Sequence, residues 1–245
     1  MKSEIARMKA VILAGGRGTR LEPYTTVLPK PLMPLGDMPV LELLIRQLKR
    51  SAVRDITIAV GHLASLIVAF FGTGERLGVC VTYSHEREPL GTAGPLALVQ
   101  GLSEPFLVLN GDLLTDLDFA AMSAAHRRSG AAATIGLYTR EIQIELGVIE
   151  TDDANTVVRY VEKPTHQYRA SMGAYVFEPR VLTHLPSGQP FDLPDLIRAL
   201  IAAGERVNGY DHEGYWLDIG QRADYERAQK DFEAMRPRLL GIDGD

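Results

Sequence analysis

Residues 13–30 read LAGGRGTRLEPYTTVLPK, and this stretch indicates both the fold class and the kind of ligand. It starts at the end of an apolar run, Lys9–Ala14, which predicts a buried strand. Three glycines follow, and glycine lets a backbone turn sharply and bring its N–H groups close to a ligand. Arg20 and Lys30 place two cations beside these amides. The stretch therefore predicts a polyphosphate site at the end of a strand.

Two common phosphate-binding motifs do not fit this stretch. A Walker A loop requires G-x-x-x-x-G-K-[ST], which the stretch does not contain. The dinucleotide-binding fingerprint requires a third glycine where this chain has Leu21. The next predicted strand, Asp55–Val60, is followed by Gly61 and His62, without the acid that would hold a ribose in that fold. We therefore exclude both motifs.

The composition predicts one compact domain. Of 245 residues, 46% are hydrophobic and 23% are charged, which suits an α/β domain with a large core. The net charge of −5 predicts no nucleic-acid partner. No apolar run reaches about 18 residues, so no membrane span is expected. The first ten residues lack a signal-peptide core, and a single cysteine excludes a disulfide framework, so a cytoplasmic protein is expected. That cysteine, Cys80, is expected to be a buried core residue.

Strand and helix patterns alternate through the first half of the chain. The expected strands are Lys9–Ala14, Asp55–Val60, Val79–Ser84 and Phe106–Leu109. The expected helices are Pro39–Ala52, Leu63–Phe71, Gly91–Leu102 and Phe119–Ser129, the last with Asp118 as its N-cap. This alternation predicts a Rossmann-like α/β fold, in which helices flank a mostly parallel mixed sheet and ligands bind at the carboxyl ends of the strands.

The second half mixes shorter elements. The expected strands are Ala131–Thr139, Gly147–Glu150, Val157–Glu162, Met172–Phe177 and Tyr215–Ile219. The expected helices are Asp192–Ala203, capped by Asp192, and Arg222–Met235. No linker separates the two halves, so we expect a single domain over residues 1–240.

Two acidic residues lie at the ends of apolar strands. Asp112 follows the run that begins at Phe106, and Asp218 is the lone acid in its own apolar run. Two carboxylates, phosphate oxygens and water make a typical Mg²⁺ site. Asp116 and Asp118 form a D-x-D pattern that metal-dependent glycosyltransferases use, so that activity stays an alternative.

A longer pattern runs from Gly15 to Thr25 as G-G-x-G-T-R-L-x-P-x-T, and P-K-P follows around Lys30. It resembles the signature of the sugar-phosphate nucleotidyltransferases, a family with a GT-A-like fold. The resemblance implies that a nucleoside triphosphate and a sugar 1-phosphate are the partners and that the products are a nucleotide sugar and pyrophosphate. It also implies that residues 8–130 bind the nucleotide and residues 131–235 bind the sugar phosphate.

An E-K-P motif at residues 162–164 also matches this family. By this resemblance, Lys163 neutralises the phosphate of the sugar, and Glu162 accepts hydrogen bonds from sugar hydroxyls. Gly147 matches a glycine that admits the sugar, although Leu146 replaces the usual aromatic. The pair Asp112 and Asp218 resembles the metal-binding pair of the family.

No catalytic triad is found in the sequence, and the reaction that the resemblance implies needs none. Its nucleophile would be an oxygen of the sugar 1-phosphate, whose second pKa of about 6 makes it anionic at neutral pH. The catalyst must bring anions together and stabilise charge on the α-phosphate and pyrophosphate. Arg20, Lys30, Lys163 and one or two Mg²⁺ ions are the parts expected to do so.

The loop SHEREPLGTAGPL at residues 84–96 is similar to the base-recognition loop of mannose-1-phosphate guanylyltransferases. Guanine presents adjacent N1–H and N2–H₂ donors, which one carboxylate can accept together. Glu86 or Glu88 is expected to do so, which favours GTP over UTP, dTTP or CTP. A helix beginning near Gly91 and Thr92 is expected to add its N-terminal amides.

The sugar is left open between mannose, heptose, an amino sugar and a cyclitol, because Ser171 stands where an Asn is typical. Two further hypotheses are a non-catalytic sensor of nucleotide sugars on the same fold and a homodimer formed through the C-terminal half. The expected nucleotide-binding residues are Leu13, Ala14, Gly15, Gly16, Gly18, Thr19, Glu86, Glu88, Pro89, Gly91 and Thr92. The expected sugar-phosphate-binding residues are Asn110, Gly111, Gly147, Glu162, Lys163, Ser171 and Gly173.

Overall fold

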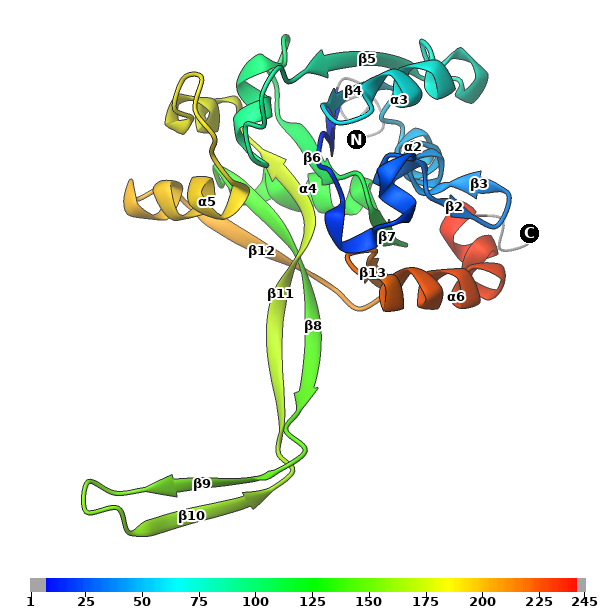
Figure 1. Ribbon diagram of the computed structural model, residues 1–245. Coiled ribbons are helices and arrows are strands. Elements are labelled where there is room, and N and C mark those ends of the chain that lie inside the picture. The colour runs from blue at the N-terminus through cyan, green and yellow to red at the C-terminus, as the bar shows by residue number, and fades with distance from the viewer. Residues whose placement is uncertain (1–7, 242–245) are drawn as a thin grey trace.

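The computed structural model describes residues 8–241, which fold around a seven-stranded sheet (Figure 1). The strand order is β12-β8-β11-β6-β1-β4-β5, and four of the six neighbouring pairs are parallel. Its strands are β1 (Lys9–Ala14), β4 (Asp55–Val60), β5 (Cys80–His85), β6 (Phe106–Asn110), β8 (Ala133–Gln143), β11 (Thr165–Phe177) and β12 (Val207–His212). The predicted mostly parallel mixed sheet is therefore confirmed.

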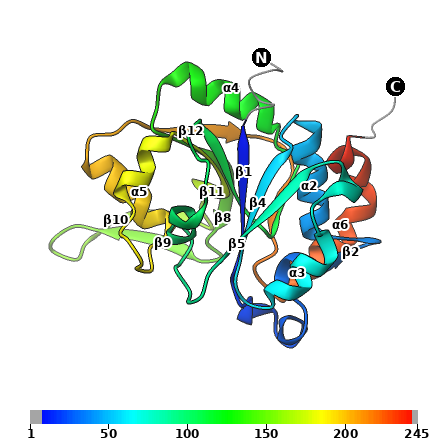
Figure 2. The same cartoon turned by 90° about the horizontal axis from the view of Figure 1, so that it is seen from above.

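Helices cover both faces of this sheet (Figure 2). Alternate residues of β1 point to opposite faces, and each face of the strand is at least half-buried, which is why this strand reads as one apolar run. Ile12 packs in the core beneath α2 (Val40–Arg50), α3 (Ala64–Phe71) and α4 (Phe119–Ser129). Val11 packs in the core of the other face, beneath α5 (Leu193–Ala202).

A small antiparallel pair lies beside the carboxyl end of β6. It joins β7 (Leu113–Thr115) to β13 (Trp216–Asp218), with Asp218 opposite Leu113. The pairing therefore brings the end of β13 beside Asp112, although the two segments are far apart in sequence. The last helix, α6 (Arg222–Leu240), then packs against α2, and β2 (Pro34–Leu35) pairs with β3 (Met38–Pro39) nearby.

A long hairpin projects from the sheet (Figure 1). Strands β8 and β11 run together beyond the body, and β9 (Gly147–Thr151) pairs with β10 (Val157–Glu162) at the far end. We call residues 139–169 the arm. Almost all of its side chains are exposed, whereas the same two strands are largely buried inside the body.

The structure differs from the sequence-based expectations at three points. The helix predicted over Gly91–Leu102 is wrong, because the structure has only a 3₁₀ turn there, η5 (Gly94–Leu98). Gly91 is held at φ +76°, and the Ala93 and Gly94 amides donate to Phe191 O rather than along a helix axis. The edge strand β12 was not predicted, since its sequence VNGYDH has no apolar run. Cys80 is exposed, not buried as predicted.

Other expectations agree with the structure. Asp118 caps α4, because its side chain accepts hydrogen bonds from the Ala120 and Ala121 amides. Between residues 8 and 241, no helix is long and apolar enough to cross a membrane. The first seven residues of the predicted domain 1–240 lie outside the described part of the chain.

Candidate nucleotide-binding and catalytic site

A cavity of about 460 Å³ opens at the carboxyl ends of β1 and β6, where the predicted loop follows β1. This volume is in the range of small-molecule sites. It is lined by Leu13, Ala14, Gly15, Gly16, Gly18, Thr19, Arg20, Lys30, Pro31, Glu86, Pro89, Gly91, Thr92, Pro95, Asn110, Asp112 and Asp218. The structure thus brings most of the sequence-predicted residues together. Pro31 and Pro95 were not predicted, although both lie within motifs that were singled out.

The glycines of the loop are needed for two different reasons. Gly18 has φ +65° and precedes the 3₁₀ turn η1 (Thr19–Leu21), and Thr25 Oγ1 donates to its carbonyl at 2.9 Å. A Cβ on Gly15 would lie 2.3 Å from a carboxylate oxygen of Glu86, so this glycine admits Glu86 into the cavity wall. Gly16, by contrast, has open space at its Cβ position. The loop therefore presents bare backbone to the cavity.

Asp112 and Asp218 lie together in the cavity with Lys30. The Lys30 ammonium contacts Asp112 Oδ2, and the two side chains are only 14% and 17% exposed. Asp218 opens to the cavity, yet surrounding protein atoms remove enough water to raise its pKa to about 6. The Asp112 carboxylate raises this pKa further, whereas Lys30 and Arg20 oppose the shift. Two carboxylates that resist being charged together are a fitting site for a divalent cation.

A cation at this site would also need ligands from the substrate. In residues 8–241, no group of three or more His, Cys, Asp or Glu side chains could hold a metal ion. Two carboxylates with phosphate oxygens and water would match the way Mg²⁺ is bound through one or two carboxylates plus phosphates. The donor set therefore fits a cation that arrives with a nucleotide.

We expect Asp218→Asn to stabilise the protein above pH 6. Because the pKa of Asp218 is raised from 3.8 to about 6 on folding, the folded state binds the proton more tightly than the unfolded state. Stability is then greatest below about pH 4 and declines as the pH rises towards 6. Asparagine does not titrate, so without divalent cations its melting temperature should exceed that of wild type by a few degrees at pH 7.5 and match it at pH 4. Equal melting temperatures at both pH values would contradict this assignment.

Glu86 lies in the wall of the cavity. Its Oε2 accepts a hydrogen bond from the Leu90 amide at 3.0 Å, and burial raises the pKa of its carboxyl despite that bond. Glu88, the alternative from sequence, is exposed and does not line the cavity. The structure therefore distinguishes the two glutamates, because Glu86 lines the cavity and Glu88 does not.

The loop that carries Gly91 and Thr92 is fixed by the segment before α5. Asp192 Oδ1 accepts from the Thr92 amide at 2.9 Å and from its hydroxyl at 3.1 Å. The Thr92 hydroxyl also accepts from the Leu193 amide at 2.8 Å. Asp192 therefore makes no side-chain cap to its own helix, which corrects the predicted capping role. The prediction that helix N-terminal amides near Gly91 and Thr92 face a ligand is also wrong, because no helix begins there and the Thr92 amide donates to Asp192.

Three predicted sugar-site residues lie just outside the cavity lining. Gly111 passes so close to β1 that a Cβ would lie 2.8 Å from Leu13 O. Gly173, at φ +74°, packs against Asn110, which does line the cavity. The Ser171 hydroxyl lies 2.9 Å from the Tyr175 hydroxyl. Gly111 and Gly173 thus shape the backbone around the site.

The remaining predicted sugar-site residues are on the arm, outside the cavity. Gly147 lies against Tyr160, whose ring would clash with a Cβ there. The Tyr160 hydroxyl donates to Glu162 at 2.7 Å, which raises the pKa of Tyr160. Lys163 has φ +44°, and its Nζ lies 3.8 Å from Glu145 Oε2. The structure does not bring these residues together with Asp112 and Arg20 within one chain.

The D-x-D pattern is occupied by structural interactions. The Asp116 side chain is only 6% exposed, contacts Arg238, and has its Oδ1 2.9 Å from His212 Nε2. Asp118 caps α4. Neither side chain lines the cavity, so the geometry gives no support to the glycosyltransferase alternative.

Comparison with known proteins agrees with the fold and the cavity. The profile of the nucleotidyl transferase family matches residues 9–235, so the chain belongs to this family. A UTP–glucose-1-phosphate uridylyltransferase from Synechocystis sp. is 38% identical over 90% of this chain and 62% of the relative. A mannose-1-phosphate guanyltransferase from Schizosaccharomyces pombe is 36% identical over 89% of this chain and 62% of the relative. The chain therefore spans 62% of the length of these two relatives.

A solved structure shows the same fold. HddC from Yersinia pseudotuberculosis has a TM-score of 0.72 and 24% identity, with 92% of this chain and 99% of that chain covered. This likeness confirms the predicted α/β fold, and the match to the family profile confirms the predicted family.

Proposed function

We propose that this chain transfers a nucleotidyl group from a nucleoside triphosphate to a sugar 1-phosphate. An oxygen of the sugar phosphate attacks the α-phosphorus, the bond between that phosphorus and the bridging oxygen breaks, and pyrophosphate leaves. The observation that carries this proposal is one cavity in which the glycine loop, Arg20, Lys30 and the pair Asp112 and Asp218 meet. Relatives named for such transfers support it.

The residues divide this work between binding and charge stabilisation. The loop amides and Arg20 would hold the phosphates, and a cation beside the α-phosphate stabilises charge that develops as pyrophosphate leaves. Asp112 and Asp218 would hold Mg²⁺, which supplies positive charge at the phosphates when bound. Lys30 contacts Asp112 and orients that carboxylate. No side chain has to remove a proton, because the attacking phosphate oxygen is anionic at neutral pH.

We infer that GTP is the nucleotide, because Glu86 offers a carboxylate in the cavity wall. One carboxylate oxygen already accepts from Leu90, and the other lies beneath Gly15. Guanine N1–H and N2–H₂ are adjacent donors that suit this group. Leu13, Ala14 and Gly15 supply backbone next to it.

Residues on the arm would recognise the sugar phosphate. Separately, the free thiol of Cys80 supports a cytoplasmic location.

We expect Glu86→Gln to weaken the preference for GTP over UTP by about 10- to 100-fold. The glutamine amide is uncharged and accepts fewer hydrogen bonds from guanine than the glutamate carboxylate does. The measurement is kcat/KM for both nucleotides. Glu88→Gln is the matched control, since Glu88 is exposed and outside the cavity, and its selectivity should equal that of wild type. An unchanged ratio in Glu86→Gln would refute the assignment of the base.

The activity itself is tested by pyrophosphate release with Mg²⁺. GTP, UTP, dTTP, CTP and ATP are each combined with mannose, glucose, glucosamine, heptose and cyclitol phosphates. Release with GTP and one sugar would support both the reaction and the nucleotide. Release only with another nucleotide would keep the reaction and overturn GTP. No release from folded protein that still binds nucleotide would favour the sensor hypothesis.

A further inference from the structure

We propose that two copies of this chain exchange arms, so that each cavity is completed by Lys163 and Glu162 of the partner subunit. The inference rests on the proposed function and specifies where the sugar-phosphate-binding residues come from. It starts from an incomplete site. Among residues 8–241 of one chain, Arg20 and Lys30 are the cations that line the cavity, and Lys30 is already in contact with Asp112. A second phosphate-bearing substrate needs a further cation, and Lys163 is exposed on the arm.

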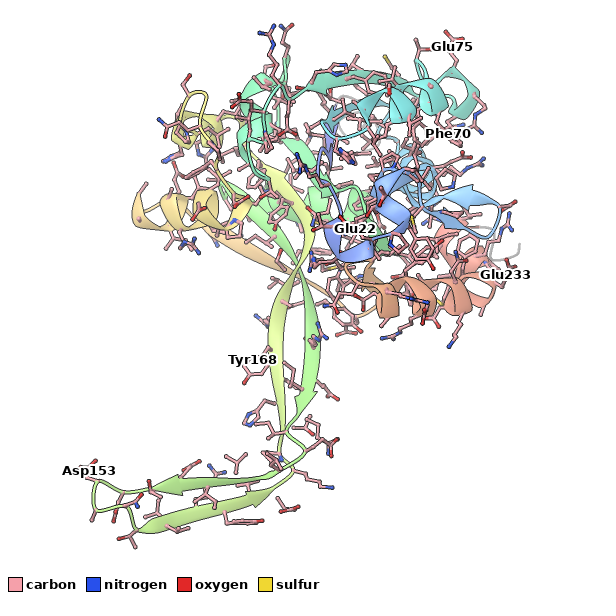
Figure 3. All side chains as sticks on the ribbon, viewed as in Figure 1. Glu22, Phe70, Glu75, Asp153, Tyr168 and Glu233 are labelled. Carbon is pink, nitrogen blue, oxygen red and sulfur yellow. The ribbon has the colours of Figure 1, made fainter. Side chains whose placement is uncertain are left out.

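The arm cannot bring Lys163 to the cavity of its own chain without breaking its strands. Pairing between β8 and β11 is continuous from Gln143 opposite Thr165 to Leu137 opposite Ser171. These six residue steps span about 20 Å, and Lys163 lies beyond them. Figure 3 shows the same geometry, with Tyr168 part way along the arm and Asp153 at its tip. A closing movement within one chain would have to break or sharply bend this ladder.

The arm carries apolar side chains that need a covering surface. Among the described residues, eight of the fourteen exposed large apolar side chains lie between residues 142 and 168. An isolated two-stranded ribbon is marginally stable in water, so such a hairpin gains stability by packing against another surface. Ile149 is paired with Tyr160, and each is more than half exposed. Glu162 lies two residues from Tyr160 on the same face of the ribbon, so one face combines apolar contact with a sugar-binding carboxylate.

The body has an exposed apolar groove, formed by the loop that also lines the cavity. An apolar groove of about 450 Å³ is lined by residues that include Pro23, Tyr24, Val27 and Tyr225. Val27 is 75% exposed and Tyr24 is 43% exposed. The groove and the cavity are lined by one loop, in which Gly18 faces the cavity and Tyr24 faces the groove. The Thr25 hydroxyl donates to the Gly18 carbonyl and so joins the two parts of this loop. An arm from a second copy that covers this groove therefore arrives beside the phosphate-binding loop. A reciprocal exchange of this kind is the contact that a two-fold dimer makes twice.

The decisive experiment mixes two inactive variants. Lys163→Ala damages only the arm, and Asp218→Asn damages only the body, so each protein alone should lose turnover. In mixed dimers formed by unfolding and refolding them together, one of the two cavities combines an intact body with an intact arm. We expect about a quarter of wild-type turnover from a 1:1 mixture. A mixture of Asp112→Asn and Asp218→Asn, which both damage the body, should stay inactive.

Three results would overturn the proposal. They are full activity of Lys163→Ala alone, no recovery in the mixture of arm and body variants, and recovery in the mixture of two body variants. The first two would mean that the arm is not needed or acts within its own chain. The third would mean that recovery does not depend on exchange of arms.

A second measurement does not depend on catalysis. Replacing residues 144–164 by Asn-Gly joins Gln143 directly to Thr165 through a two-residue turn that suits an antiparallel hairpin. We expect light scattering to give the mass of two chains for wild type and of one chain for this variant. A truncated protein that stays dimeric, or a monomeric wild type, would overturn arm exchange. A dimer that needs the arm but shows no turnover with any substrate would instead count against the proposed function alone.

Discussion

Asp112→Asn and Asp218→Asn should each lower turnover by more than about 100-fold while nucleotide still binds, because even residues behind the ligands of a metal site typically contribute 10- to 100-fold. Asparagine keeps the size of the side chain but removes its charge, so the pair loses its attraction for a divalent cation. The backbone amides and Arg20 remain to bind phosphates. The measurements are kcat for pyrophosphate release and the dependence of rate on Mg²⁺ concentration. Near-normal Mg²⁺-dependent turnover in either variant would remove Asp112 and Asp218 as the metal pair.

Asp118→Asn is the matched control for these two variants. The change is chemically identical, and asparagine is as good an N-cap as aspartate, so α4 keeps its cap. Turnover should equal that of wild type. A large loss in Asp118→Asn, together with active Asp112→Asn, would instead favour the D-x-D alternative.

The sequence was sufficient to place the glycine loop and Asp112 in the cavity on the body. The run Lys9–Ala14 is apolar on both faces, as a central parallel strand must be, and the loop after such a strand lies at the ligand-binding edge. Asp112 could be placed by the same rule. Asp218 could be placed only by analogy, because the pairing of β13 with β7 is a long-range contact with no local signal.

Other features depended on contacts that no local pattern encodes. The sequence around Gly91 and Thr92 suits a helix start, but Asp192, a hundred residues later, binds Thr92 and Phe191 holds the following amides. Glu86 and Glu88 are equivalent in the sequence, and only the close approach of Glu86 to Gly15 distinguishes them. The two strands at the end of the arm were predicted, as Gly147–Glu150 and Val157–Glu162. The polar stretch that extends β11 towards Thr165 has little strand character of its own, so the projection of the arm from the body could not be predicted.

Arg20→Ala should lower kcat/KM by about 1,000-fold, the low end of what a positioned arginine contributes to phosphoryl transfer. Arg20 lies in η1 and lines the cavity, and its charge opposes the raised pKa of Asp218, which places it near the carboxylate pair. The guanidinium can contact two phosphate oxygens at once, so Arg20→Lys should recover only part of the loss. Steady-state kinetics of pyrophosphate release would measure both variants.

Arg17→Ala controls for the loss of a positive charge from the same loop. Arg17 is exposed and does not line the cavity, so its removal changes the general field but no phosphate contact. Its effect should be small and should fade as salt screens exposed charges, whereas the effect of Arg20→Ala should persist. If the two variants lost activity equally and both losses vanished at high salt, the loop would act only by attracting anions. A large, salt-independent loss in Arg20→Ala alone therefore distinguishes direct stabilisation of the phosphates from attraction at a distance.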